Sequence, residues 1–303
     1  MGRQHQLAFV LSGGGARGAL QAGALRALFE RGIHPDLLVG TSAGALNAAF
    51  IGLDPTREQA VRLEEAWRTA ARHHLFPADW MSVVTRALMN RAGVKPNPRL
   101  REFFVAHMPD PAVRFRQMSV PVYLVAADLN HARAVLYGEQ PDQSVLEGLL
   151  ASTALPPWAH PLEVGDQFLI DGGAVSSLPI EPALARGATE IIALDLSEPD
   201  EVDPAARGFG PFASKLLNTV ARRQTELELR LAAAHQVPVH HLKLRFEPPV
   251  MFWDFTHADE LIERGYALTR RYLDEAWLPR PATWMDRARD WWNTQRPSPS
   301  TMG

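Results

Sequence analysis

The 303-residue chain contains no cysteine. Disulfide bonds, thiolate metal ligands and a cysteine nucleophile are therefore excluded, and this composition suits a reducing compartment. The chain also lacks any apolar run near the ~20 residues that a transmembrane helix needs. The five apolar residues Leu7–Leu11, which precede the first glycines, are too few for the centre of a signal peptide. We therefore expect a cytoplasmic protein.

A large excess of charge of either sign is missing as well. The 31 Lys and Arg residues nearly balance 34 Asp and Glu residues, which gives a net charge of -3. Such a surface has no general attraction to nucleic acid, so we expect no nucleic-acid partner. The 46% hydrophobic and 21% charged residues are typical of a globular protein with a sizeable core.

Short apolar runs alternate with helical patterns along the chain. The predicted strands are Leu7–Leu11, Leu37–Val39, Val122–Ala127, Phe168–Ile170, Ile191–Leu194 and Val237–Leu244, and Ala134–Tyr137 is expected to form a hairpin with the third of them. Strands that alternate with helices indicate an α/β fold whose sheet is parallel or mostly parallel and is covered on both faces.

Two glycine-rich turns follow the first two predicted strands. The first, SGGGARG, spans Ser12–Gly18, and the second, GTSAG, spans Gly40–Gly44. The second turn places Ser42 at the centre of a G-x-S-x-G elbow, which presents a serine oxygen at the head of a sheet. The first turn aligns backbone N–H groups at a helix start, which suits it to hold a developing negative charge. Together they indicate acyl-ester chemistry.

The glycines also satisfy the dinucleotide-binding pattern G-x-G-x-x-G through Gly13, Gly15 and Gly18. That pattern further requires an acidic residue at the end of the second strand, to bind the ribose. Here the second strand runs into the serine elbow, and the nearest acid, Asp36, precedes it. The sequence therefore disfavours a dinucleotide site.

A Ser–Asp–His triad of the α/β-hydrolase kind is the second alternative. Candidate histidines lie downstream of Ser42, but none stands in a turn directly after a strand, and Ser42 follows only two strands. The candidates are His160, His235, His240, His241 and His257. We interpret the adjacent pair His240 and His241 as structural. A third reading needs no histidine, because a partly buried Asp171, which opens an Asp-Gly-Gly turn, could itself accept the serine proton.

Taken in order, SGGGARG, GTSAG, ASTALP (Ala151–Pro156) and DGG (Asp171–Gly173) resemble the pattern of patatin-like phospholipases of the bacterial branch. The resemblance implies a three-layer α/β/α fold with a mostly parallel sheet. It also implies a Ser–Asp dyad, a lipid acyl hydrolase activity, and no metal or organic cofactor. Carried over by motif, Ser42 is the nucleophile, Asp171 the general base, and Gly13–Gly15 the oxyanion hole. Arg17, Gly18 and Ala43 support that loop and the elbow.

The implied substrates are acyl esters of phospholipids, lysophospholipids or related lipids. A lipid-directed acyltransferase stays open as an alternative, because any well-placed alcohol can intercept an acyl-serine. A malonyl transacylase is disfavoured, since the expected elbow helix carries Asn47 and no arginine to bind a carboxylate. A catalytically silent lipid-binding module is disfavoured by the intact serine, base and glycine loop.

We predict a catalytic domain over residues 1–280 and an aromatic, basic tail over 281–303. Trp284, Trp291 and Trp292 recur there at helical spacing among several arginines. A helix of this kind can lie in a membrane interface, which would make the protein a peripheral membrane binder. The alternative, which we favour, is that these tryptophans dock onto the catalytic domain, and both interpretations stay open. The sequence predicts no oligomeric state.

Overall fold

The computed structural model describes residues 5–72, 98–108, 110–156, 158–197 and 209–276. The chain divides into two compact units, Met1–Arg270 and Arg271–Gly303. Of the second unit, the described residues are only 271–276, the end of the last helix. The predicted boundary between residues 280 and 281 lies outside the described residues. In the part of the chain that is described, no helix is both long and apolar enough to span a bilayer.

An eight-stranded sheet forms the centre of the first unit, in the order β5-β6-β3-β2-β1-β7-β8, with β4 paired to β3. Five of its strands run parallel: β1 (Leu7–Leu11), β2 (Leu37–Thr41), β3 (Val122–Asp128), β7 (Glu190–Asp195) and β8 (Val239–Lys243). Three strands at one side are antiparallel to their neighbours: β4 (Arg133–Tyr137), β5 (Leu162–Val164) and β6 (Gln167–Asp171).

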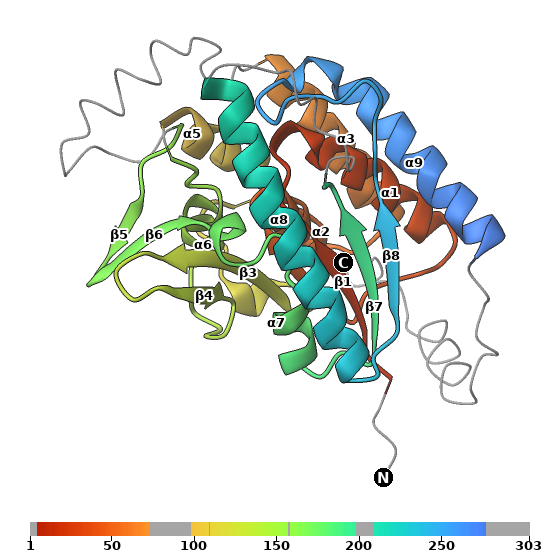
Figure 1. Ribbon diagram of the computed structural model, residues 1–303, viewed down its shortest axis with the longest axis horizontal. Coiled ribbons are helices and arrows are strands. Elements are labelled where there is room, and N and C mark those ends of the chain that lie inside the picture. The colour runs from red at the N-terminus through yellow and green to blue at the C-terminus, as the bar shows by residue number, and fades with distance from the viewer. Residues whose placement is uncertain (1–4, 73–97, 109, 157, 198–208, 277–303) are drawn as a thin grey trace, which may run out of the picture. The chain divides into compact units, whose positions relative to one another are not determined.

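Helices cover both faces of this sheet (Figure 1). The α-helices are α1 (Gly18–Glu30), α2 (Ala43–Leu53), α3 (Arg57–Arg72), α5 (Pro98–His107), α6 (Val145–Ser152), α7 (Ile180–Ala185), α8 (Phe209–Ala234) and α9 (Ala258–Glu275). Four short 3-10 helices lie at Gly15–Arg17, Phe115–Gln117, Gly172–Ala174 and Phe255–His257. Helix α8 crosses in front of the sheet in Figure 1 and packs on α7, whereas α2 contacts β1, β2 and β3 from the other side.

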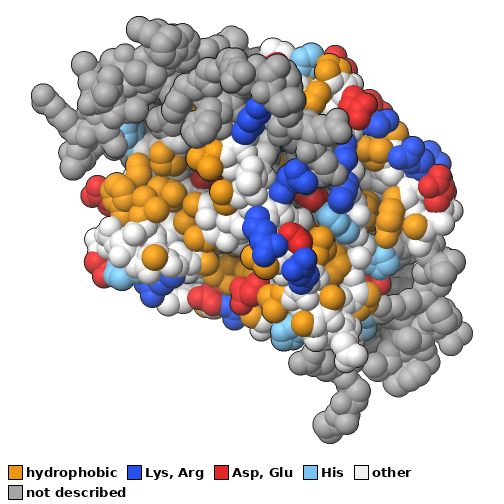
Figure 2. Space-filling view, in the orientation of Figure 1, with side chains coloured by type: hydrophobic (Ala, Val, Ile, Leu, Met, Phe, Trp, Pro, Cys, Tyr) orange, Lys and Arg blue, Asp and Glu red, His pale blue; other side chains and the backbone are white. Residues whose placement is uncertain are grey.

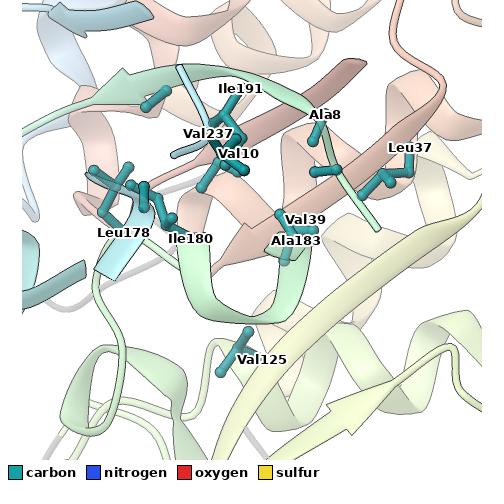
Figure 3. Close-up of a cluster of buried hydrophobic side chains, with 13 residues drawn as sticks. Ala8, Val10, Leu37, Val39, Val125, Leu178, Ile180, Ala183, Ile191 and Val237 are labelled. Carbon is teal, nitrogen blue, oxygen red and sulfur yellow. The ribbon is translucent and has the colours of Figure 1, made fainter. Parts of the chain in front are cut away.

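The core on the α7 side is built from alternate residues of the parallel strands. In a strand, successive side chains point to opposite faces, so Ala8 and Val10 of β1 share one face with Leu37 and Val39 of β2. Figure 3 shows these side chains as part of one buried cluster that also includes Ile180 and Ala183 of α7. All five residues of β1 are buried, because the strand is covered on both faces.

The join between β2 and β6 positions the site. Strand β3 pairs with β4 along Leu124–Asp128, which occupies one edge of β3. Strands β2 and β6 must therefore share the other edge, where Thr41 pairs with Val125 and Asp171 pairs with Ala126. Since β2 runs parallel to β3 and β6 runs antiparallel to it, the carboxyl ends of β2 and β6 meet head-on at this point.

The α/β fold with a central, mostly parallel sheet and helices on both faces is confirmed. The β3–β4 hairpin is also present as predicted. The sequence pattern missed the antiparallel insertion of β6 beside β3, because the pairing of distant strands depends on side-chain packing rather than on local propensity. The sequence also shows a helical pattern over Met81–Arg91, which lies outside the described residues.

Candidate active site

Ser42 lies at a strained turn between β2 and α2. Its backbone has φ 55° and ψ -121°, a conformation that non-glycine residues rarely adopt and that is found at functional sites. The flanking glycines are required sterically. A Cβ on Gly40 would lie 2.3 Å from the carbonyl oxygen of Gly44, and one on Gly44 would lie 2.2 Å from that of Leu11. The elbow therefore holds its serine by close backbone packing.

Asp171 ends β6 and lies in the interior, with only 5% of its surface exposed. Its Oδ1 accepts a hydrogen bond from the Gly173 N–H at 2.8 Å. Burial raises the pKa of this carboxyl to about 6, and hydrogen bonding from the Ser42 hydroxyl and the Gly173 N–H opposes that rise. A carboxylate with a raised pKa beside a hydroxyl is suited to accept its proton.

The ASTALP segment contacts both residues. The Ser152 hydroxyl accepts a hydrogen bond from the Ser42 N–H at 3.0 Å and donates to the Val125 carbonyl at 2.6 Å. The Ala154 carbonyl accepts the N–H of Asp171 at 2.9 Å. The ASTALP segment thus fixes the backbone at both Ser42 and Asp171 through hydrogen bonds.

The glycine loop approaches the elbow closely. An added Cβ on Gly13 would lie 3.2 Å from the Cβ of Ser42, and the Gly13 N–H donates to the Ser177 carbonyl at 3.0 Å. Among the described residues, the N–H groups of Gly14 and Gly15 donate to no protein acceptor. Gly15 has φ +58°, and a Cβ there would lie 2.2 Å from the Phe252 carbonyl oxygen. Gly14 and Gly15 therefore retain the two available donors of the loop.

The supporting residues predicted from the motif lie around this loop. Arg17 Nε donates a hydrogen bond to the Gly14 carbonyl at 3.2 Å, and this bond stabilises the glycine loop. Gly18 begins α1, where a Cβ would lie 2.4 Å from the Trp67 ring. Ala43 begins α2 directly after Ser42, so the positive end of the helix dipole lies next to the Ser42 side chain.

A buried polar chain behind the loop was not predicted as part of the site. Gln21 Nε2 donates to the carbonyls of Ser12 and Leu194 at 3.0 and 2.9 Å. Its Oε1 accepts from Asn47 Nδ2 at 2.9 Å, and Asn47 Oδ1 accepts from Trp67 Nε1 at 2.8 Å. These side chains join the start of the glycine loop to α2 and α3. The only signal in the sequence is the presence of polar residues on otherwise apolar helix faces.

A pocket of about 330 Å³ opens over Ser42 and Asp171. Its described lining is mostly apolar and includes Leu46, Trp67, Leu100, Phe103, Phe104, Leu155, Ile170 and Phe252. Pockets of this composition bind apolar ligand groups, with a few polar groups that fix orientation. No histidine is among the described residues that line it.

The adjacent histidines are bound to other carboxylates. His240 Nε2 contacts Glu190 Oε1 at 2.8 Å, and His241 Nε2 contacts Asp195 Oδ2 at 2.7 Å. They pair across β7 and β8, where His240 lies opposite Ile192 in the strand register. This arrangement fits the structural role inferred for them. Within the described ranges, no three His, Asp or Glu side chains are grouped as metal ligands would be.

The chain belongs to the patatin-like phospholipase family, whose family model matches residues 9–184. It is 25% identical over 295 residues to patatin-like phospholipase domain-containing protein 7 of Mus musculus, covering 88% of this chain and 20% of that protein. It is 29% identical over 210 residues to lysophospholipase NTE1 of Mycosarcoma maydis, covering 67% of this chain and 10% of that protein. The chain thus spans a fifth or less of the length of these two relatives. Their names give no support to the acyltransferase alternative.

Among solved structures, VipD from Legionella pneumophila is similar to this chain with a TM-score of 0.47 and 15% identity, over 89% of this chain and 67% of that one.

The family match runs through both glycine motifs, the ASTALP segment and Asp171, all of which lie within residues 9–184. The resemblance inferred from the motifs is therefore confirmed at the level of the family.

Proposed function

We propose that this protein is a serine lipid acyl hydrolase in which Ser42 and Asp171 form a catalytic dyad. The observation that carries the proposal is the meeting of the two residues at the join of β2 and β6, with the carboxyl buried and its pKa raised to about 6. At neutral pH most of such a carboxyl is ionised, yet it keeps more basicity than an exposed aspartate.

In the proposed reaction, Ser42 Oγ attacks the carbonyl carbon of an ester and Asp171 accepts the hydroxyl proton. The oxygen of the tetrahedral intermediate accepts hydrogen bonds from the N–H groups of Gly14 and Gly15. Each such donor is typically worth about 3 kcal/mol of transition-state stabilisation. Collapse of the intermediate releases the alcohol, which takes the proton from Asp171. Water then attacks the acyl-serine while Asp171 accepts its proton, and Asp171 returns that proton to Ser42 Oγ as the bond to the acyl group breaks and the carboxylic acid leaves.

The apolar lining of the pocket supports a long-chain acyl group as the part of the substrate that is bound. Fatty-acyl esters of lysophospholipids or phospholipids match this lining together with the family. The polar head group would then lie away from this apolar lining, and Arg17 is the one cationic residue among the described residues that line the pocket.

A fluorophosphonate probe and a panel of acyl esters test this proposal. Ser42→Ala should abolish labelling, whereas Ser177→Ala, a serine that lines the same pocket, should leave it intact. Asp171→Asn should lower kcat by ~10³-fold or more, while the exposed control Asp166→Asn should retain activity. Labelling that survives Ser42→Ala unchanged would exclude this site.

We further propose that the substrate reaches the pocket from a lipid surface. Leu217 of α8 lines the pocket and is 42% exposed, and Leu216 and Val220 beside it are 54% and 39% exposed. Exposed leucines at the rim of an apolar pocket favour contact with acyl chains. The tryptophan- and arginine-rich segment from Arg280 onward supplies a second candidate contact from the sequence.

Flotation with anionic vesicles distinguishes these two contacts. Leu216→Ser with Val220→Ser should weaken vesicle binding if α8 is the docking helix, and removal of residues 280–303 should weaken it if the tail is the anchor. Binding that neither change affects would reject a peripheral membrane contact of either kind.

A further inference from the structure

A second cavity, of about 400 Å³, lies between α8 and the ends of β7 and β8. Its described lining comprises Asp195, Ser197, Thr219, Arg222, Arg223, Thr225, Glu226, Leu229, His241, Lys243 and Arg245. Figure 2 shows Lys and Arg side chains gathered on this face, with acidic side chains among them. In contrast to the pocket over Ser42, its walls are mostly polar and include four Arg or Lys residues.

The regular structure of both walls explains why these cations converge. Residues two apart in a strand share a face, so His241 and Lys243 of β8 point to the same side, and Arg245 continues this alternation. Residues at i, i+3, i+4 and i+7 share a helix face. Thr219, Arg222, Arg223 and Glu226 follow that spacing on α8.

The acidic groups of the cavity already have cationic partners. Glu226 pairs with Arg223 at 2.7 Å and also with Arg230. Asp195 pairs with His241 and accepts hydrogen bonds from the backbone N–H and hydroxyl of Ser197. The lining contains four Arg or Lys residues and two carboxylates, so the cavity keeps an excess of positive charge.

Arg245 gives an independent indication of a ligand. Its Nε is buried, and within the described part of the chain this atom has no hydrogen-bond partner. A buried donor without an acceptor costs free energy, so the guanidinium of Arg245, which lines the cavity, keeps a donor that no described protein group satisfies. Guanidinium groups donate through two adjacent N–H groups and therefore suit the oxygens of a phosphate.

We propose that this cavity binds a phosphoryl group, held by Arg222, Lys243 and Arg245. Its volume exceeds that of a phosphate ion, so the phosphoryl group of a larger molecule also fits. Helix α8 separates the cavity from the pocket over Ser42, since Leu217, Asn218 and Ala221 line that pocket while Thr219 and Arg222 line this one. The site is therefore distinct from the proposed catalytic centre and does not depend on the proposed hydrolase activity.

Calorimetric titration with inorganic phosphate at fixed ionic strength tests the proposal. The test variant is Arg222→Glu with Lys243→Glu. The matched control, Arg62→Glu with Arg101→Glu, makes the same charge change on exposed residues of α3 and α5. Circular dichroism of each variant shows whether it is folded. We expect phosphate to bind the wild type and the control with equal Kd, and the test variant at least tenfold more weakly.

A second arm identifies the source of the phosphoryl group. If the site takes a lipid phosphate, vesicles of phosphatidylcholine that contain phosphatidic acid should bind the wild type and the control. The test variant, although folded, should not bind these vesicles. Vesicle binding without binding of inorganic phosphate assigns the site to a lipid phosphate. Binding of inorganic phosphate without vesicle binding assigns it to a soluble phosphate. The proposal is overturned if neither probe binds, or if the control loses binding as much as the test variant.

Discussion

The hydroxyl of Ser152 lies 3.0 Å from the backbone nitrogen of Ser42 and accepts its N–H hydrogen bond. The same hydroxyl donates to the Val125 carbonyl at 2.6 Å. Because Ser152 is fully buried, its position is fixed by packing of α6. Ser42, which has an unfavourable backbone conformation, is thus held by a side chain 110 residues away in the sequence.

Replacing Ser152 with Ala should lower kcat more than it changes KM. The substitution removes the acceptor for the Ser42 N–H, and a hydrogen bond of this kind contributes about 1 kcal/mol, which corresponds to a roughly fivefold fall in rate. Steady-state kinetics on a soluble ester measures the effect. Ser144→Ala at the other end of α6 removes a helix cap instead and should leave kcat unchanged. An unaltered kcat in Ser152→Ala would show that the turn around Ser42 keeps its conformation without the Ser152 hydrogen bond.

The pH dependence of the reaction should report the Asp171 carboxyl. Its pKa is raised to about 6 by burial, and a general base must be ionised to accept a proton. We therefore expect kcat/KM to rise with pH through an apparent pKa near 6 and to level off above pH 7. A profile that is flat from pH 5 to 8 would exclude Asp171 as the base.

Asp171→Asn should be more stable than the wild type at neutral pH, although we expect it to lose activity. The folded-state pKa of about 6 exceeds the ordinary value of 3.8, so the folded protein binds the proton more tightly than the unfolded chain does. The free energy of unfolding then falls as pH rises from about 4 to 6 and stays lower above pH 6. This cost amounts to at most about 3 kcal/mol, and a neutral amide avoids it. Urea denaturation at pH 7.5 and pH 4 gives the comparison, and a lower stability of the variant at pH 7.5 would contradict this account.

Replacement of His240 and His241 by Ala should reduce stability but leave kcat largely intact. Each histidine pairs with a buried carboxylate, Glu190 or Asp195, and loss of the partner costs about 1–3 kcal/mol per group. Thermal unfolding and ester hydrolysis at 25 °C separate the two effects. A collapse of kcat in a folded variant would favour a histidine-dependent triad.

Much of the site could be predicted from the sequence because its loops are local. Gly13–Gly15 and the elbow around Ser42 each follow a strand and begin a helix, so a few residues specify both the turn and its chemistry. The glycines are needed where a Cβ would meet backbone at little more than 2 Å, as at Gly40 and Gly44. Such requirements are visible as motifs without knowledge of the rest of the chain.

Other parts of the site could not be predicted because they depend on distant pairing. Ser152 and Asn47 are polar residues in apolar helices, and their roles follow only from the carbonyls and side chains that surround them. The basic cavity likewise needs α8 to lie beside β8, although each wall has an ordinary amphipathic pattern.

The sequence by itself indicated the family through its ordered motifs, and it predicted most of the strands. It also predicted the glycine turns around Gly13–Gly15 and Ser42, because such turns arise from short-range steric rules. Only the tertiary structure decided that Asp171 lies beside Ser42. That contact requires β6 to occupy the edge of β3 beyond the end of β2, a choice made by burial of apolar side chains across the sheet. The same burial raises the pKa of Asp171, since desolvation depends on everything packed around the carboxyl.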